Sequence, residues 1–275
     1  MDAVRASLSQ FLRHYLVALQ YFTRLPVTGS IAQWTDFRPE MLRASAVHFP
    51  GVGLVVGFVA CFAFAVVSLG LPTRPLNLLA AAFACTIATA LLTGAFHEDG
   101  LADLADGLGG SADRERALEI MKDSRIGSFG AMALVLTLGL KLSLIGVIAS
   151  ESAGGVMAAL LAAHVVSRYW PLFIIHTLPY AGDAEHSKSK PLAERIERRS
   201  LVLAGLWCVL PLLLLGVAGG WISLLLALVA SALAWYAMRQ LLQRRLQGFT
   251  GDGLGATQQV CEVAFYLGVG FGLGR

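Results

Sequence analysis

Charged residues are scarce in this sequence: Asp, Glu, Lys and Arg together make up only 14% of its 275 residues. Soluble domains carry about 25% charged residues, because their surfaces face water. The hydrophobic fraction of 56% and the mean hydropathy of +0.68 deviate in the opposite direction. These values exclude an ordinary soluble domain and predict a polytopic membrane protein.

Several other features are also missing. The four cysteines have no metal-ligand or redox-motif spacing, so we expect them only to fill space. The net charge is just +3, and no Lys/Arg run is interleaved with aromatic residues, which argues against nucleic acid as a partner. No compact apolar segment with a small-residue cleavage site precedes residue 45, so we expect no removable signal peptide.

Long apolar runs dominate the chain instead. A membrane-spanning helix needs about 20 predominantly apolar residues. Runs of this kind occupy residues 47–71, 76–96, 128–150, 153–178, 200–218, 220–238 and, more weakly because it is rich in glycine, 256–274.

An N-terminal region, residues 1–45, precedes these spans. Its apolar residues recur at steps of three and four from Val4 to Phe22, which predicts an amphipathic helix that lies in the membrane interface or packs on the bundle.

We therefore predict an all-α fold in a single domain, residues 1–275. It is a polytopic membrane helical bundle of about six to seven transmembrane helices with an N-terminal amphipathic helix.

Lys and Arg lie mostly in alternate connecting segments. They concentrate in residues 1–45, in the acidic segment 97–126, in the loop 179–199 and after the sixth span. The positive-inside rule then places these segments in the cytoplasm and the C-terminus outside. In the loop, His186, Lys188 and Lys190 can cover a substrate or bind anionic lipid.

The acidic segment is the strongest functional signal. It begins His97-Glu98-Asp99-Gly100-Leu101-Ala102-Asp103-Leu104-Ala105-Asp106-Gly107. On an α-helix, Asp99, Asp103 and Asp106 fall within an arc of roughly 60°. Like charges on one face repel each other unless a cation lies among them, and an all-oxygen ligand set favours Mg²⁺. The pattern predicts a Mg²⁺ site; the alternative is a set of aspartates that cap helices and turns.

A second polar segment surrounds Lys122 and Arg125. The two cations are three residues apart on a helix expected to end near Gly127, so both can point the same way. Together with Asp123 and Ser124, they suit a phosphate-bearing substrate beside a metal. The alternative is that the two basic residues only set the membrane topology.

A third polar segment begins at Gly251. Gly251, Gly253 and Gly255 alternate along the chain ahead of the last helix, which predicts a loop whose backbone N–H groups bind phosphate. Asp252 is then a further metal ligand or a general base. The alternative is a flexible turn.

Three polar residues lie inside the predicted spans. Lys141, His164 and Arg168 are expected to face the bundle interior or a wet cavity, because exposure of such side chains to lipid is unfavourable. Arg168 is nearer the cytoplasmic end and is the best placed of the three to bind an anion. The alternative is interhelical hydrogen bonding or snorkelling.

Three blocks of the sequence resemble the cobalamin synthase (adenosylcobinamide-GDP ribazoletransferase) family. They are His97 to Asp103 with Asp106-Gly107, Met121 to Gly127 with Phe129-Gly130, and Gly251-Asp252 with Gly255-Ala256-Thr257. The resemblance covers essentially the whole chain. It implies a Mg²⁺-dependent transferase of the bacterial inner membrane that joins adenosylcobinamide-GDP and α-ribazole, or its 5′-phosphate, to give adenosylcobalamin, or its 5′-phosphate, and GMP.

The resemblance also implies roles for individual residues. Asp99, Asp103 and Asp106 would hold Mg²⁺, Lys122 and Arg125 would neutralise developing charge, and Asp252 or a helix aspartate would take the hydroxyl proton. We further expect substrate contacts from Asp123, Ser124, Gly251, Gly253 and Arg168. Expected partners are the two substrates and the lipid bilayer, and a homo-oligomer stays an option.

Two other functional classes compete with this interpretation. A CDP-alcohol phosphotransferase runs similar chemistry from an acidic helix, but its signature has Ala-Arg where Asp103 and Leu104 stand here. A cation-coupled transporter would explain the polar residues within the spans, but it would place its acidic residues at mid-membrane depth.

Overall fold

The computed structural model describes residues 2–35, 39–72, 75–182 and 196–274. The described chain is built of helices, which confirms the predicted all-α class. They are α1 (Asp2–Phe22), α2 (Gly29–Thr35), α3 (Pro39–Ser45), the short 3-10 helix η1 (Ala46–His48), α4 (Phe49–Gly70), α5 (Pro75–Thr93), α6 (Phe96–Gly110), α7 (Arg114–Met121), α8 (Ser128–Glu151), α9 (Ala153–Thr177), α10 (Arg198–Gly219), α11 (Trp221–Arg245) and α12 (Gly251–Gly272).

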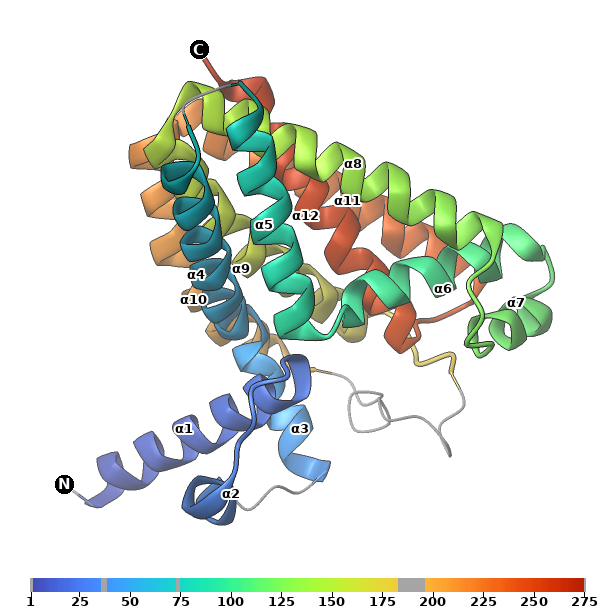
Figure 1. Ribbon diagram of the computed structural model, residues 1–275. Helices are drawn as coiled ribbons and strands as arrows, with labels where there is room; N and C mark the ends of the chain where they lie inside the picture. The colour runs from blue at the N-terminus through green and yellow to red at the C-terminus, as the bar shows by residue number, and fades with distance from the viewer. Residues whose placement is uncertain (1, 36–38, 73–74, 183–195, 275) are drawn as a thin grey trace.

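The long helices form a bundle with two distinct ends (Figure 1). Helices α1 to α3, α6 and α7 gather at one end, and the C-terminus lies at the other. Six helices of the described chain have the length and hydropathy of membrane spans: Met41–Gly70, Leu76–Thr93, Ser128–Glu151, Ala153–Thr177, Arg198–Gly219 and Trp221–Arg245. The weak seventh segment, residues 256–274, is also mostly helical, but α12 is not among these six.

Burial separates the central helices from the outer ones. The most apolar stretch of α9 is 83% buried, against 33% or less in the other five spans. Outward-facing side chains are large and apolar: Phe58 is 62% exposed, Leu69 85% and Val217 80%. Such surfaces suit contact with lipid, which confirms the membrane character inferred from composition.

Helix α1 packs on the bundle along part of its length, which is one of the two arrangements considered for it. Its C-terminal half packs on the bundle, where Val17 and Ala18 are fully buried and the Tyr15 hydroxyl donates a 3.2 Å hydrogen bond to the Gly51 carbonyl. Its N-terminal half extends away from the bundle (Figure 1), and Leu8 is 57% exposed there. The amphipathic pattern therefore describes a helix only partly covered by protein.

The connection after α9 is tied to the start of α12. Phe249 N–H donates to the Pro179 carbonyl at 2.9 Å, and Ala181 N–H donates to the Phe249 carbonyl at 2.8 Å. This short backbone pairing holds the chain just before α12 in place. Most of the predicted loop 179–199, including His186, Lys188 and Lys190, lies outside the described residues.

Candidate functional site

The acidic segment is helical as predicted, and helix α6 carries it across the end of the bundle. Leu101 and Leu104 are buried in the core, so the leucines hold one side of α6 against its neighbours. Glycines allow two close approaches. A Cβ at Gly100 would lie 2.9 Å from the Asp252 carbonyl oxygen, and one at Gly107 would lie 2.5 Å from the Met121 Cγ. Helices α12 and α7 are therefore the elements that approach α6 closely at these two glycines.

The charges of Asp99, Asp103 and Asp252 act on one another where α6 crosses α12. We call these three residues the acidic cluster. Burial, then the charges of Asp99, Asp252 and Asp106, raise the pKa of Asp103 to about 7. Burial, then the charge of Asp99, raises the pKa of Asp252, on the first turn of α12, to about 6. The structure thus brings Asp252 from the third polar segment to the aspartates of the first.

The donor set of the acidic cluster fits a hard divalent cation. It offers only carboxylate oxygens, and their mutual repulsion is the condition that a bound cation relieves. In the described part of the chain, no three Asp, Glu, His or Cys side chains converge closely enough to hold a metal ion as they stand. Mg²⁺ commonly binds through one or two carboxylates and keeps several waters, so a looser group of oxygens still suits it.

Asp106 has a structural role that the sequence suggested only as an alternative. Its carboxylate accepts hydrogen bonds from the backbone N–H of Gly127 at 2.7 Å and of Gly130 at 2.9 Å, at the start of α8. A Cβ at either glycine would lie 2.4 Å from a carboxylate oxygen of Asp106. Asp106 therefore ties α6 to α8, and both glycines are needed for its approach. Its part in a metal site stays a prediction.

The helix expected to carry both Lys122 and Arg125 is shorter than predicted. Helix α7 ends at Met121, and Lys122 is its C-cap, so the expectation of two cations on one helix was wrong. The Asp123 carboxylate accepts the Arg125 N–H at 3.1 Å and thereby favours a turn over another helical turn.

The side chains of Asp123 and Arg125 also form an ion pair of 2.6 Å. Hydrogen bonds from Arg125 lower the pKa of Asp123 to about 2. Both residues line a surface hollow together with Asp106, Arg116 and Gly127, while Ser124 is exposed nearby.

The glycines after Thr250 do not form the predicted loop. Helix α12 begins at Gly251, and the Thr250 side chain caps it by accepting the Gly253 N–H at 3.1 Å. The capping threonine starts the helix earlier than the glycine pattern indicated. Gly255 serves the crossing of α6 and α12, because a Cβ there would lie 3.3 Å from the Cα of His97.

The polar residues of the spans face the interior, as predicted. Lys141 forms a 2.6 Å ion pair with Glu262, and both side chains are at most 2% exposed. Arg168 donates to the His164 carbonyl at 2.9 Å. The partner Glu262 was missed by the sequence interpretation, although its spacing of four from Gln258 already placed the two on one face.

A chain of buried amides connects this ion pair to the acidic segment. The Gln258 side-chain amide donates to Glu262 at 2.7 Å and to Ser167 at 2.9 Å. The Gln259 amide donates to the Gln258 side-chain oxygen at 3.0 Å and to Glu98 at 3.1 Å. Helix α12 thus links the middle of the bundle to α6 through side-chain hydrogen bonds.

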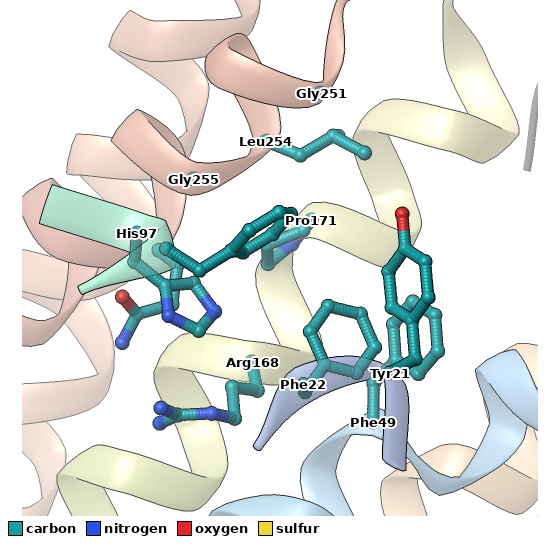
Figure 2. A pocket seen from close by; sticks show the side chains of 11 residues that line it. Tyr21, Phe22, Phe49, His97, Arg168, Pro171, Gly251, Leu254 and Gly255 are labelled. Atoms are coloured by element: carbon teal, nitrogen blue, oxygen red, sulfur yellow. The ribbon is translucent and has the colours of Figure 1, made fainter. Parts of the chain in front are cut away.

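An aromatic pocket shares helices α6 and α12 with the acidic cluster, and no sequence motif predicted it. Helices α1, α4, α6, α9 and α12 all contribute to it (Figure 2). Its lining is Tyr21, Phe22, Phe49, Phe96, His97, Arg168, Pro171, Gly251, Leu254, Gly255 and Gln258. Burial, then the charge of Arg168, lowers the pKa of His97 well below its usual value, so His97 is a neutral member of the wall. The helices that line the pocket are far apart in the sequence, and they meet because the first turns of α12 pack against His97 at the start of α6.

Comparisons with known proteins agree with one another. The family model described as cobalamin-5-phosphate synthase matches residues 14–270. A Polaromonas species has a relative named adenosylcobinamide-GDP ribazoletransferase that is 54% identical over 97% of this chain and 99% of its own. Relatives with the same name from Albidiferax ferrireducens and Leptothrix cholodnii are 53% and 44% identical, over 97% and 96% of this chain and 100% and 97% of their own. No solved structure matches the chain.

Proposed function

The chain belongs to the cobalamin-5-phosphate synthase family, and from this premise we propose that it joins adenosylcobinamide-GDP to α-ribazole or α-ribazole 5′-phosphate. The products are adenosylcobalamin, or its 5′-phosphate, and GMP. The observation that carries the proposal is the acidic cluster: carboxylates from two helices lie together at the end of the bundle, two of them with pKa values near neutral.

The reaction is a displacement at phosphorus. The ribose 3′-hydroxyl of the ribazole attacks the phosphorus on the cobinamide side of the diphosphate, a new P–O bond forms, and the P–O bond to GMP breaks. The hydroxyl proton passes to a carboxylate. A raised pKa makes Asp252 or Asp103 a better base for this step than an ordinary aspartate, because proton transfer is most efficient when the pKa of the base lies near the working pH.

We propose that Mg²⁺ binds at Asp99, Asp103 and Asp106. When bound, it would supply positive charge against the diphosphate oxygens. The charges of Asp106 and Asp252 both act on Asp103, but Asp106 already accepts two backbone hydrogen bonds, whereas the Asp252 carboxylate has a pKa raised by burial and by the charge of Asp99. This difference favours Asp252 as a further oxygen donor.

The polar segment around Arg125 supports binding of the phosphates. Lys122 and Arg125 supply positive charge, and Asp123 and Ser124 supply hydrogen-bonding groups near the hollow beside Asp106. Arg125 must exchange part of its ion pair with Asp123 for a phosphate oxygen.

At the start of α12, Gly251 is free of a side chain and borders the aromatic pocket, which suits close approach of a substrate. The Gly253 N–H already donates to Thr250 and serves to fix the helix start. Arg168 lines the same pocket and would contribute positive charge from its wall.

We further propose that the chain resides in the bacterial inner membrane, with the α6 end of the bundle in the cytoplasm. The support is the distribution of basic residues: Arg114, Arg116, Arg198, Arg199, Arg244 and Arg245 all lie in segments at this end. GDP-activated substrates are available on that side of the membrane.

The variant Asp99→Asn tests the role of the acidic cluster. It removes one charge and keeps the side-chain shape, so turnover should fall at least about 100-fold while the protein still inserts into the membrane. The matched control is Asp113→Asn at the N-cap of α7, where Asn caps as well as Asp and activity should stay unchanged. Near-normal turnover of Asp99→Asn would contradict the assignment.

A further inference from the structure

The surface hollow beside Asp106 lies where the end of α6, helix α7 and the start of α8 come together (Figure 1). Its volume is about 520 Å³, within the range of about 300–1,000 Å³ that is typical of small-molecule pockets. Part of its lining is apolar and open to solvent, because Ile126 and Phe129 are both exposed there. A hollow of this size and lining can hold a flat organic group.

Two glycines at the end of α6 let the apolar side chains of the hollow pack closely. A Cβ at Gly109 would lie 2.4 Å from the Phe129 Cγ, and one at Gly110 would lie 3.0 Å from the Ile120 Cδ1. The ring of Phe129 therefore rests against the backbone of α6, while Phe129 as a whole is 45% exposed. A ring that is supported on one side and open on the other offers a stacking surface to a planar base.

The two carboxylates at the rim of the hollow differ in how far they are already engaged. Both oxygens of Asp123 accept hydrogen bonds from Arg125. Glu119 bonds within the described chain to Arg116 alone, at 2.9 Å through Oε2, and its side chain is 66% exposed. Because a carboxylate has about four acceptor positions, Glu119 can accept two further N–H groups without losing Arg116.

Guanine is the nucleobase whose edge matches such a carboxylate. Its N1–H and its 2-amino group are neighbouring donors, so one carboxylate accepts from both. Adenine places an unprotonated ring nitrogen beside its amino group, and a carboxylate repels that nitrogen. The base that Glu119 favours is therefore the base of the proposed GDP-linked donor substrate.

The hollow is connected to the acidic cluster along one face of α6. Asp103 and Gly110 are seven residues apart, so they differ by only about 20° around the helix and lie about 10.5 Å apart along it. Asp106 lies between them, lines the hollow and contributes its charge to the raised pKa of Asp103. A nucleoside diphosphate spans a comparable length from its base to its second phosphorus, so its phosphates can reach the cluster from the hollow.

We propose that the surface hollow binds the guanosine half of the adenosylcobinamide-GDP donor, with the purine stacked on Phe129 and its N1–H and 2-amino group donating to Glu119. The inference rests on the proposed function and adds a residue, Glu119, that determines specificity for guanine. Arg116 holds the Glu119 carboxylate in place through their ion pair, and Arg125 is left for the phosphates.

Equilibrium dialysis of labelled GMP and AMP against the full chain, in detergent with Mg²⁺, tests the hollow. We expect the unmodified chain to bind GMP at least about tenfold more tightly than AMP. Glu119→Gln replaces one acceptor oxygen with a donor, so the Kd for GMP should rise at least about tenfold, while the Kd for AMP stays within about twofold. The matched control is Glu115→Gln on the same helix, where Glu115 pairs with Arg114 outside the hollow and both constants should stay unchanged.

A second variant tests the stacking surface separately. Phe129→Leu removes the ring and keeps an apolar side chain, so it should weaken GMP and AMP by a similar factor of about fivefold. Its control is Met132→Leu, three residues further along the exposed face of α8, which should change neither affinity.

Three results would overturn the proposal. They are a preference for GMP that survives in Glu119→Gln, affinities that are unchanged in Phe129→Leu, and an unmodified chain that does not bind GMP.

An assay of coupled products separates this inference from the proposed function. If the unmodified chain forms GMP and the corrinoid product together but its preference for GMP does not depend on Glu119, only the assignment of the hollow fails. If the unmodified chain forms neither product from the two substrates, the proposed function fails, whatever the dialysis shows.

Discussion

Aspartates of this chain differ widely in acidity because their neighbours differ. Asp123, hydrogen-bonded to Arg125 at the surface, has a pKa of about 2. Asp103, half-buried with three other carboxylates around it, has a pKa of about 7. The contrast separates an aspartate that stabilises a turn from one that can exchange a proton near neutral pH.

The raised pKa of Asp103 predicts how pH changes stability. Between the ordinary value of 3.8 and about 7, the folded protein holds a proton that the unfolded chain has already lost. Ionisation of Asp103 therefore destabilises the metal-free protein as pH rises toward 7. Because Mg²⁺ binds the ionised form, the increase in Tm on adding Mg²⁺ should grow between pH 5.5 and 7.5.

Thermal unfolding in detergent with and without Mg²⁺ measures this dependence. In Asp103→Asn the pH dependence of the Mg²⁺ effect should weaken at the upper end of this range, because Asp103 no longer titrates and Asp252, with a pKa of about 6, is left. An increase in Tm of equal size at both pH values in the unmodified chain would contradict a role of Asp103 in cation binding.

Among the elements, the crossing of α6 and α12 does most to build the site. Gly100→Ala would place a Cβ 2.9 Å from the Asp252 carbonyl oxygen and 3.0 Å from its Cα, both backbone atoms. The two helices must then separate, so we expect Gly100→Ala to lower Tm and to reduce turnover at least about tenfold.

The matched control for this crossing is Gly146→Ala on α8. Nothing lies within 4 Å of a Cβ built at Gly146, so its replacement should leave turnover intact and leave Tm unchanged or higher. Equal effects of the two substitutions would contradict the close approach of α6 to α12.

The sequence predicts the elements better than it predicts their contacts. Hydropathy locates the spans, and the alternating steps of three and four locate α1, because burial in lipid or protein sets both patterns. The extent of α7 and the start of α12 were misjudged because local side-chain hydrogen bonds of Asp123 and Thr250 decide them.

The candidate site shows the same difference: the part carried by one helix could be predicted from the sequence, and the part built by contacts between helices could not. The carboxylates of α6 were found from helical periodicity, since one helix brings them together. The aromatic pocket combines Tyr21, Phe49, His97 and Leu254 from four helices, and nothing in a single sequence signals that meeting. The ion pair of Lys141 with Glu262 also depends on tertiary packing, although the need of Lys141 for a partner was predictable.

At the scale of the whole molecule, the two ends of the bundle differ in chemistry. One end carries the acidic cluster, the aromatic pocket and most basic residues, and the other carries short connections and the C-terminus (Figure 1). The proposed orientation predicts that a cysteine at Ala112, exposed between α6 and α7, faces the cytoplasm, and that one at Leu71, 43% exposed after α4, faces the opposite side.

Labelling of intact cells with a membrane-impermeant maleimide measures the orientation. Leu71→Cys should react, and Ala112→Cys should react only after the membrane is opened. The unsubstituted chain is the control, because three of its four cysteines, Cys85, Cys208 and Cys261, are buried, and Cys61 is half-buried within the span of α4. Labelling of Ala112→Cys in intact cells would reverse the proposed topology.

The central claim is that one end of the bundle couples breakage of a diphosphate to formation of a new phosphodiester. The most direct measurement follows GMP and the corrinoid product together in membranes containing the full chain, with adenosylcobinamide-GDP, with or without α-ribazole 5′-phosphate and with or without Mg²⁺. We predict equal amounts of the two products, formed only when both the ribazole and Mg²⁺ are present. Release of GMP without the ribazole, or coupled products in the presence of a chelator, would contradict the account.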